Sequence, residues 1–116
     1  NMLIHGREIG FAFTVGASAE VAKMCPNNDI TRIGEVLGAD FVKNVEISTA
    51  LILLLNDGYV GIEKLMGREA ERITREEILL LTPAELNAVV AHIMHTMAGD
   101  SHGEVEATPK NEGAEA

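Results

Sequence analysis

The sequence predicts a mainly α protein of the α+β class, in which a short N-terminal β-hairpin precedes about five or six helices and a disordered acidic tail. Three observations support this class. Apolar residues alternate near the N-terminus, helix-capping signals recur between residues 14 and 85, and apolar side chains almost vanish beyond Gly99. We therefore expect one small, compact helical bundle over residues 2–99 and a disordered tail over residues 100–116.

The hairpin is predicted from Met2 to Thr14. Ile9, Phe11 and Phe13 recur at every second position, which places their side chains on one face of a strand. The dipeptide His5–Gly6 precedes them, and a tight two-residue turn needs the positive φ that glycine adopts freely. This stretch is therefore expected to fold back on itself at residues 5 and 6.

The face of the hairpin opposite the aromatic residues is almost bare, because Gly10 and Ala12 point there. Either a helix backbone lies close against this face or the free strand edge pairs with another chain. Two strands alone are marginally stable in water, so the hairpin must pack on the helices or on a partner. Phe11 and Phe13 are accordingly the candidate partner-binding residues of the N-terminal region.

Cap and stop residues divide the first part of the helical region. A first helix is expected from Ala17 to Met24, because Pro26 cannot continue it. A short helix capped by Asp29 and ended by Gly38 follows. Asp40 is expected to cap a central helix whose second half is apolar on all sides, as in helices that are buried.

The sequence Asn56-Asp57-Gly58 is expected to end the central helix, since glycine and asparagine commonly follow the last helical turn. A separate helix from Tyr59 to Met66 would then precede Gly67. On this interpretation, residues 41–66 form two helices of moderate length.

The last two helices carry the clearest start signals. Thr74 with Glu77 and Thr82 with Glu85 have the capping-box spacing, in which hydroxyl and carboxylate each accept a free backbone N–H. Pro83 occupies the first helical position, where its missing N–H costs nothing. The last helix has an apolar stripe made of Leu86, Val89, Val90, Ile93, Met94 and Met97.

Charge and composition argue against several classes of partner. The net charge is −9, of which the tail carries −4 and the remainder −5. Acidic parts repel phosphate, and the chain has only three phenylalanines, one tyrosine and no tryptophan for base stacking, so we expect no nucleic-acid partner. The longest apolar run, Ala50–Leu55, is too short to span a membrane. With one cysteine and no secretory segment, the chain is expected to be cytoplasmic.

No set of residues predicts catalysis or a bound cofactor. His92 and His95 have a spacing that can place two imidazoles on one helix surface, but a helical wheel puts both on the polar face, and the sequence supplies no third metal ligand. We expect both to face solvent. Cys25 is expected to be a small buried apolar residue rather than a nucleophile. The prediction is therefore a non-enzymatic protein with no metal and no cofactor.

The acidic tail allows two interpretations. Glu104, Val105 and Glu106 lie in a segment that could fold on a basic partner, or the tail could serve solubility alone. These three residues are the candidate partner-binding residues of the C-terminal region.

Three stretches of the chain, residues 4–17, 30–37 and 81–86, together with the polar tail, carry a resemblance that spans most of its length. They resemble the small tail assembly chaperones of long-tailed phages and prophages of Gram-positive bacteria. Such proteins often have asparagine before the turn glycine, where this chain has His5. The resemblance implies a non-enzymatic, self-associating protein of the host cytoplasm that coats the tape measure protein and helps recruit tail tube subunits.

The resemblance also implies a longer product, because many of these chaperones are extended by a programmed −1 frameshift. Pro109, Lys110 and Asn111 can be encoded as CCA-AAA-AAC, which contains the slippery heptamer A-AAA-AAC. These three residues mark the candidate frameshift site, and the present chain would be the short form.

Two other functions remain open on the sequence alone. The chain could be a small homo-oligomeric adaptor or regulatory module of the host that uses the hairpin edge for β-addition. It could also be an enzyme or a metal-dependent factor that uses His92 and His95, a function that the missing third ligand disfavours.

Overall fold

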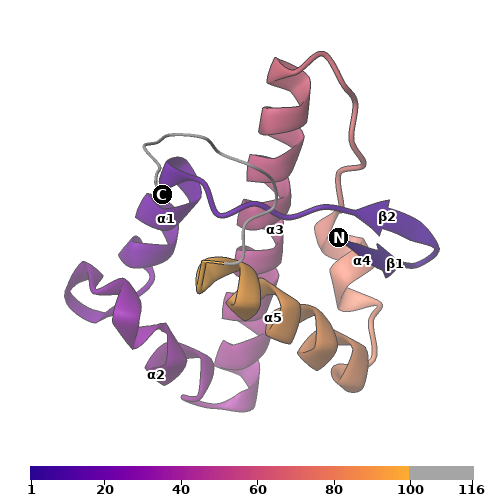
Figure 1. Cartoon of the computed structure of the whole chain (residues 1–116). Coiled ribbons are helices and arrows are strands. Elements are labelled where there is room, and N and C mark those ends of the chain that lie inside the picture. The colour runs from indigo at the N-terminus through magenta and orange to yellow at the C-terminus, as the bar shows by residue number, and fades with distance from the viewer. Residues whose placement is uncertain (100–116) are drawn as a thin grey trace.

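The computed structural model of the protein describes residues 1–99 and confirms the predicted class, with a two-stranded N-terminal hairpin followed by helices (Figure 1). The predicted tail, 100–116, lies outside the described residues. Within residues 1–99 the elements are β1 (Met2–Ile4), β2 (Arg7–Ile9), α1 (Val15–Lys23), the 3₁₀ turns Pro26–Asn28 and Ile30–Arg32, α2 (Ile33–Leu37), α3 (Phe41–Leu65), α4 (Arg75–Leu79) and α5 (Pro83–Met97).

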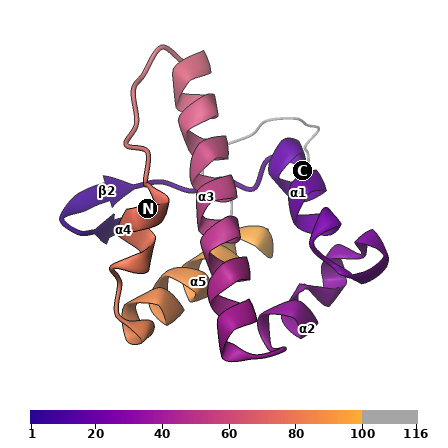
Figure 2. The same ribbon diagram turned by 180° about the vertical axis from the view of Figure 1, so that it is seen from behind.

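Helix α3 is the central element, and the other elements pack around it. Figures 1 and 2 show α1 and α2 on one side of α3, the hairpin and α4 on the other side, and α5 crossing α3. The chain between β2 and α1 runs across α3 to connect the two sides. The apolar residues that are buried most completely come from several of these elements: Ile9, Val21, Leu51, Ile52, Leu55 and Ile93.

The hairpin turns where the sequence predicts, but its strands are shorter than expected. His5 and Gly6 both have positive φ, 50° and 81°, and the pairing runs from Met2 opposite Ile9 to Ile4 opposite Arg7. Residues beyond Ile9 do not pair in the sheet. Ala12 instead donates its backbone N–H to the carbonyl oxygen of Leu55 in α3, at 3.0 Å. The predicted strand up to Thr14 is therefore wrong, because α3 takes over the backbone bonding of this segment.

Side-chain caps begin α1, the second 3₁₀ turn and α3, whereas α2 has none. Thr14 Oγ1 accepts the N–H of Ala17 at 3.0 Å, so α1 starts two residues earlier than predicted. Asp29 caps a 3₁₀ turn rather than an α-helix, and α2 follows directly and ends at Gly38 as expected. Asp40 caps α3 by accepting the N–H of Lys43 at 2.7 Å.

The predicted break at Asn56-Asp57-Gly58 is wrong, because α3 continues through it as one helix of 25 residues. The side chain of Asn56 is 1% exposed and makes tertiary hydrogen bonds instead of ending the helix. Gly58 lies against the segment that crosses α3, where an added Cβ would come within 2.9 Å of the carbonyl oxygen of Ala12. Asn and Gly at these positions resemble a helix end in the sequence, but in the structure both residues serve tertiary packing.

The predicted starts of the last two helices are confirmed. Thr74 with Glu77 begins α4, and Thr82 with Glu85 begins α5, each with both bonds of the capping box formed. Pro83 takes the first position of α5. The predicted apolar stripe of α5 faces the core, with Leu86, Val89 and Ile93 buried and Val90, Met94 and Met97 packed against them.

The continuity of α3 bears on the membrane prediction. Among the described residues, α3 alone is long and apolar enough to cross a membrane, with a mean hydropathy of 1.4 over a window of which 39% is buried. One such helix is weak evidence, because the core helix of a soluble protein has the same length and composition. The sequence did not predict a helix of this length, because the expected break at residues 56–58 divided α3 into two shorter helices.

Candidate functional site: an apolar pocket between α3, α4 and α5

The two predicted N-terminal contact residues follow β2 instead of lying in it. Phe11 is 2% exposed and its ring lies 5.7 Å from that of His92, while Phe13 is half-buried. The side chain of Phe11 therefore packs on the helices of its own chain, and a role in partner binding stays a prediction for Phe11 and Phe13. With only three residues in each strand, the hairpin also offers a short edge for β-addition.

The two histidines of α5 have different environments. His92 is half-buried against Phe11, so its predicted solvent exposure is wrong, whereas His95 is exposed. Within residues 1–99, no group of three or more histidine, cysteine or acidic side chains is placed to hold a metal ion. Sequence reasoning missed the Phe11 contact because the two residues are far apart in the chain.

Cys25 is buried, as expected. Its thiol donates to the carbonyl oxygen of Val21 at 3.4 Å. Burial, with a smaller contribution from the charge of Asp29, raises the pKa of the Cys25 thiol above its usual value. A protonated, enclosed thiol is a poor nucleophile.

The remaining predicted residues fall in the tail. Glu104, Val105 and Glu106, and the candidate frameshift residues Pro109, Lys110 and Asn111, lie outside the described residues. Their roles stay predictions.

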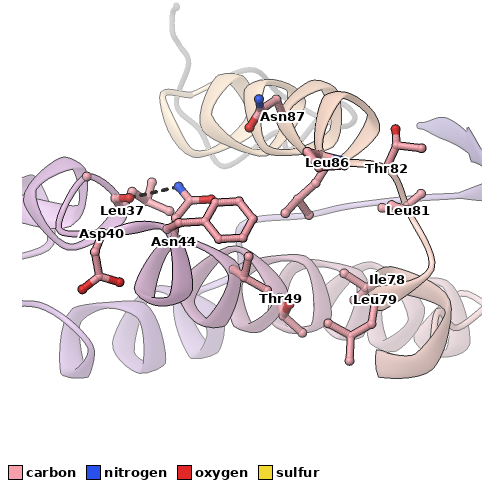
Figure 3. Close-up of a pocket in the computed structure, with 14 residues that line it drawn as sticks. Leu37, Asp40, Asn44, Thr49, Ile78, Leu79, Leu81, Thr82, Leu86 and Asn87 are labelled. Atoms are coloured by element: carbon pink, nitrogen blue, oxygen red, sulfur yellow. Dashed lines mark hydrogen bonds between the residues drawn. The ribbon is translucent and has the colours of Figure 1, made fainter.

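A pocket of about 530 Å³ opens between the first half of α3, the end of α4 and the start of α5 (Figure 3). This volume lies in the range of pockets that enclose a ligand. Its walls are largely apolar, and the residues that line it are Leu37, Gly38, Asp40, Phe41, Asn44, Val45, Thr49, Ile78, Leu79, Leu81, Thr82, Pro83, Leu86 and Asn87.

Large apolar side chains at the mouth of the pocket are exposed. Phe41 and Leu79, which line it, are 69% and 50% exposed, and their chain neighbours Val42 and Leu80 are 68% and 75% exposed. Solvent-exposed apolar groups that adjoin a cavity are typical of surfaces that bind a partner. Phe41 and Leu79 therefore leave apolar surface open to solvent at the pocket.

Three polar side chains of the pocket have distinct surroundings. Asn44 donates to the carbonyl oxygen of Leu37 at 2.9 Å, and Asp40 accepts the N–H of Lys43. Thr49 is 1% exposed, yet its hydroxyl has no hydrogen-bond partner among the described residues. Such a group is costly to bury, so replacement of this hydroxyl by a methyl group should not destabilise the fold.

The sequence contains one signal for this pocket, a run of four apolar residues. Residues 78–81 read Ile-Leu-Leu-Leu, and α4 is only five residues long. A short helix cannot turn four consecutive apolar side chains toward one core, and only Ile78 of the four is buried. The others remain available to line the pocket or its rim.

The lining of the pocket is mostly apolar, its one charged side chain is the carboxylate of Asp40, and it includes no histidine, cysteine or lysine. A scan of the chain against protein-family models finds no match, and searches of curated proteins and of solved structures also find none.

Proposed function

We propose that the protein is a non-enzymatic tail assembly chaperone of a phage or prophage. It binds apolar helical segments of the tape measure protein, keeps them soluble in the host cytoplasm and helps recruit tail tube subunits. The observation that carries the proposal is the apolar pocket between α3, α4 and α5, with Phe41 and Leu79 exposed at its mouth. The resemblance of residues 4–17, 30–37 and 81–86 supplies the identity of the client.

A single pocket of this kind gives a weak, reversible contact. A long client with many apolar segments can bind many copies at once, so that weak contacts become strong together and still dissociate one by one. Self-association of the chaperone would add to this effect. The proposal therefore includes a homo-oligomer, and a longer frameshifted form for the recruitment of tube subunits.

The proposal is tested by co-expression with the long helical protein encoded downstream at the native locus. We expect the two proteins to co-purify and the client to stay soluble only when both are present. Leu79→Glu should abolish both the co-purification and the solubility of the client, because a carboxylate at the pocket mouth opposes apolar contact. Leu65→Glu is the matched control, since Leu65 is also the last residue of its helix and is 90% exposed.

Two results would count against the proposal. The first is a client that stays soluble alone and ignores the chaperone. The second is a locus with ordinary host genes on both sides, no overlapping −1 frame and no run of A at the codons for Pro109 and Lys110. Either result would favour the host adaptor.

A further inference from the structure

We infer that His5 and Arg7 of the N-terminal hairpin are positioning residues for the pocket, because they hold α4 where Leu79 stands at the pocket mouth. These two residues form the hairpin clamp. The inference rests on the proposed function only for what the pocket binds, and the contacts between the hairpin and α4 carry the rest.

Helix α4 is too short to keep its conformation alone. It has five residues, Arg75–Leu79, and isolated helices shorter than about 12–15 residues are marginal in water. Its own support consists of the capping box of Thr74 and Glu77 and the side chain of Ile78, which is 2% exposed. Leu79, the other side chain that α4 contributes to the pocket, is half-exposed. Contacts from other elements are therefore needed to keep α4 in place.

His5 supplies such a contact at the end of α4. The carbonyl groups of a last helical turn have no partner inside the helix. The N–H of Leu81 bonds to the carbonyl oxygen of Ile78 at 3.0 Å, and not to that of Glu77. The Nε2 atom of His5 lies 2.9 Å from the Glu77 carbonyl oxygen, which can only accept, so the ring N–H donates to it. The turn of the hairpin, which lies beside α4 in Figures 1 and 2, thus caps the C-terminal end of this helix.

Arg7 binds the side chain of the same residue. Its guanidinium group forms ion pairs with the carboxylates of Glu71 and Glu77. The carboxylate of Glu77 is shared, since Oε1 accepts the N–H of Thr74 at 2.8 Å and Oε2 accepts from Arg7. The side chains of Arg7 and Glu77 are 34% and 29% exposed, so water screens this pair less than a pair at the open surface. Glu77 is therefore bonded to the hairpin through both its carboxylate and its carbonyl oxygen.

The residues that follow Glu77 form the α4 wall of the pocket. Ile78 and Leu79 both line the cavity (Figure 3), whereas no residue of the hairpin lines it. Helix α4 has only about one and a half turns, so the loss of both bonds to Glu77 would let it unwind and take Leu79 from the mouth. The hairpin thereby sets the shape of a pocket that it does not touch.

The hairpin has a separate anchor, so the clamp can be removed by itself. Ile4 and Ile9 are 4% and 0% exposed in the core, whereas His5 is exposed and Arg7 is half-buried. Replacing the two polar side chains should therefore leave the hairpin docked. His5→Asn suits the turn, because asparagine also tolerates the positive φ of 50°. Arg7→Gln removes the charge and keeps a polar side chain.

The first experiment measures amide hydrogen exchange by NMR in the full chain, without any client. In the double variant His5→Asn/Arg7→Gln, the amides of Leu80 and Leu81, which bond into the end of α4, should exchange at least about tenfold faster. The amides of α5 should keep the rates of the parent protein. The methyl signals of Leu79 should move toward their values in the unfolded chain.

Two further variants separate the clamp from a general effect of charge. Arg32→Gln is the matched control, because Arg32 also pairs with a carboxylate, that of Glu35, and its side chain is 36% exposed against 34% for Arg7. It should leave the exchange of α4 unchanged. Arg7→Lys keeps the charge, so its α4 amides should exchange more slowly than those of Arg7→Gln.

The second experiment measures the capture of the client, the long helical protein encoded downstream at the native locus. The double variant should co-purify at least about threefold less client than either the parent protein or Arg32→Gln, because a smaller fraction of its molecules has the pocket formed.

Three outcomes overturn the inference. The first is exchange of the α4 amides in the double variant that is as slow as in the parent protein. The second is equal acceleration in α4 and α5, which would give the clamp only a general role in stability. The third is selective acceleration in α4 with unchanged capture of the client. If the parent protein captures no client and the variant still shows selective acceleration, the proposed function fails and the positioning of Leu79 by the clamp stands.

Discussion

The side-chain oxygen of Asn56 accepts the backbone N–H of Ile73 at 2.8 Å, and this bond ties the middle of α3 to the segment before α4. The amide nitrogen of the same side chain donates to the carbonyl oxygens of Gly10, at 3.0 Å, and Glu71, at 3.2 Å. One buried amide thus joins three stretches of chain that are distant in the sequence.

Replacing Asn56 by alanine should lower the free energy of unfolding by about 3 kcal/mol, because the buried N–H of Ile73 would lose its acceptor and two carbonyls their donor. Urea unfolding followed by circular dichroism measures the change. The control is Asn87→Ala, an exposed asparagine of α5, which should change stability by less than about 0.5 kcal/mol. Equal effects of the two variants would contradict the bonding described for Asn56.

Two glycines of α3 should respond to alanine in opposite directions. In an open helical position alanine is better than glycine by up to about 1 kcal/mol, so Gly61→Ala should stabilise, since no atom lies within 4 Å of the added Cβ. Gly58→Ala should destabilise by about 1–2 kcal/mol, because the new methyl group meets the carbonyl oxygen of Ala12 at 2.9 Å. The midpoints of thermal unfolding of the two variants, compared with that of the parent protein, measure both effects. Stabilisation by both would mean that residues 10–14 do not cross α3 closely.

Glu77 should make stability depend on pH in the acid range. The N–H of Thr74, and then Arg7, hold the pKa of the Glu77 carboxyl below its usual value of 4.5. Because the folded-state pKa is lower, the stabilisation is present above about pH 4.5 and is lost as the pH falls through the folded-state pKa.

The isosteric variant Glu77→Gln tests this behaviour, since glutamine still completes a capping box but does not titrate. Urea midpoints measured between about pH 6 and pH 3 should fall less steeply for the variant than for the parent protein. Parallel curves would show that Glu77 does not contribute to acid unfolding.

Cys25 should react slowly with a thiol reagent in the folded protein. Burial raises its pKa above 9.0, so at pH 8 we expect the native rate to be at least about tenfold lower than the rate in urea. A native rate equal to the unfolded rate would place the thiol at the surface.

The raised pKa of Cys25 also gives a stability contribution that is present below the unfolded-state pKa and is lost as the pH rises through the folded-state pKa.

Local signals explain which parts of the fold the sequence predicts. The turn at His5 and Gly6 and the boxes at Thr74 and Thr82 are decided by bonds within a few residues, and each is confirmed. The Asn56-Asp57-Gly58 sequence has the same local signature as a helix end. Its actual role depends on Gly10, Ala12 and Ile73, whose positions are known only after the chain has folded.

The candidate site was predicted less well, for a related reason. A pocket forms where three elements fail to fill the space between them, and neither periodicity nor capping describes that gap. The run at residues 78–81 indicates surplus apolar surface, but its position opposite Phe41 and Thr49 follows from tertiary packing. The strand predicted through Phe11 failed for the same reason, because alternation predicts a strand face and says nothing of the helix that covers this segment.

The bonds of the Asn56 side chain also determine when this protein can acquire its structure during synthesis. Its partners lie 46 residues before it and 15 and 17 residues after it, and the N-terminal hairpin docks through His5 and Arg7 onto Glu77. A nascent chain therefore cannot close the core until residue 77 has left the ribosome. At about 5–20 residues per second, the 12 residues from the end of α3 at Leu65 to Glu77 take roughly 1–2 seconds to follow, and the apolar face of α3 stays uncovered for at least that time.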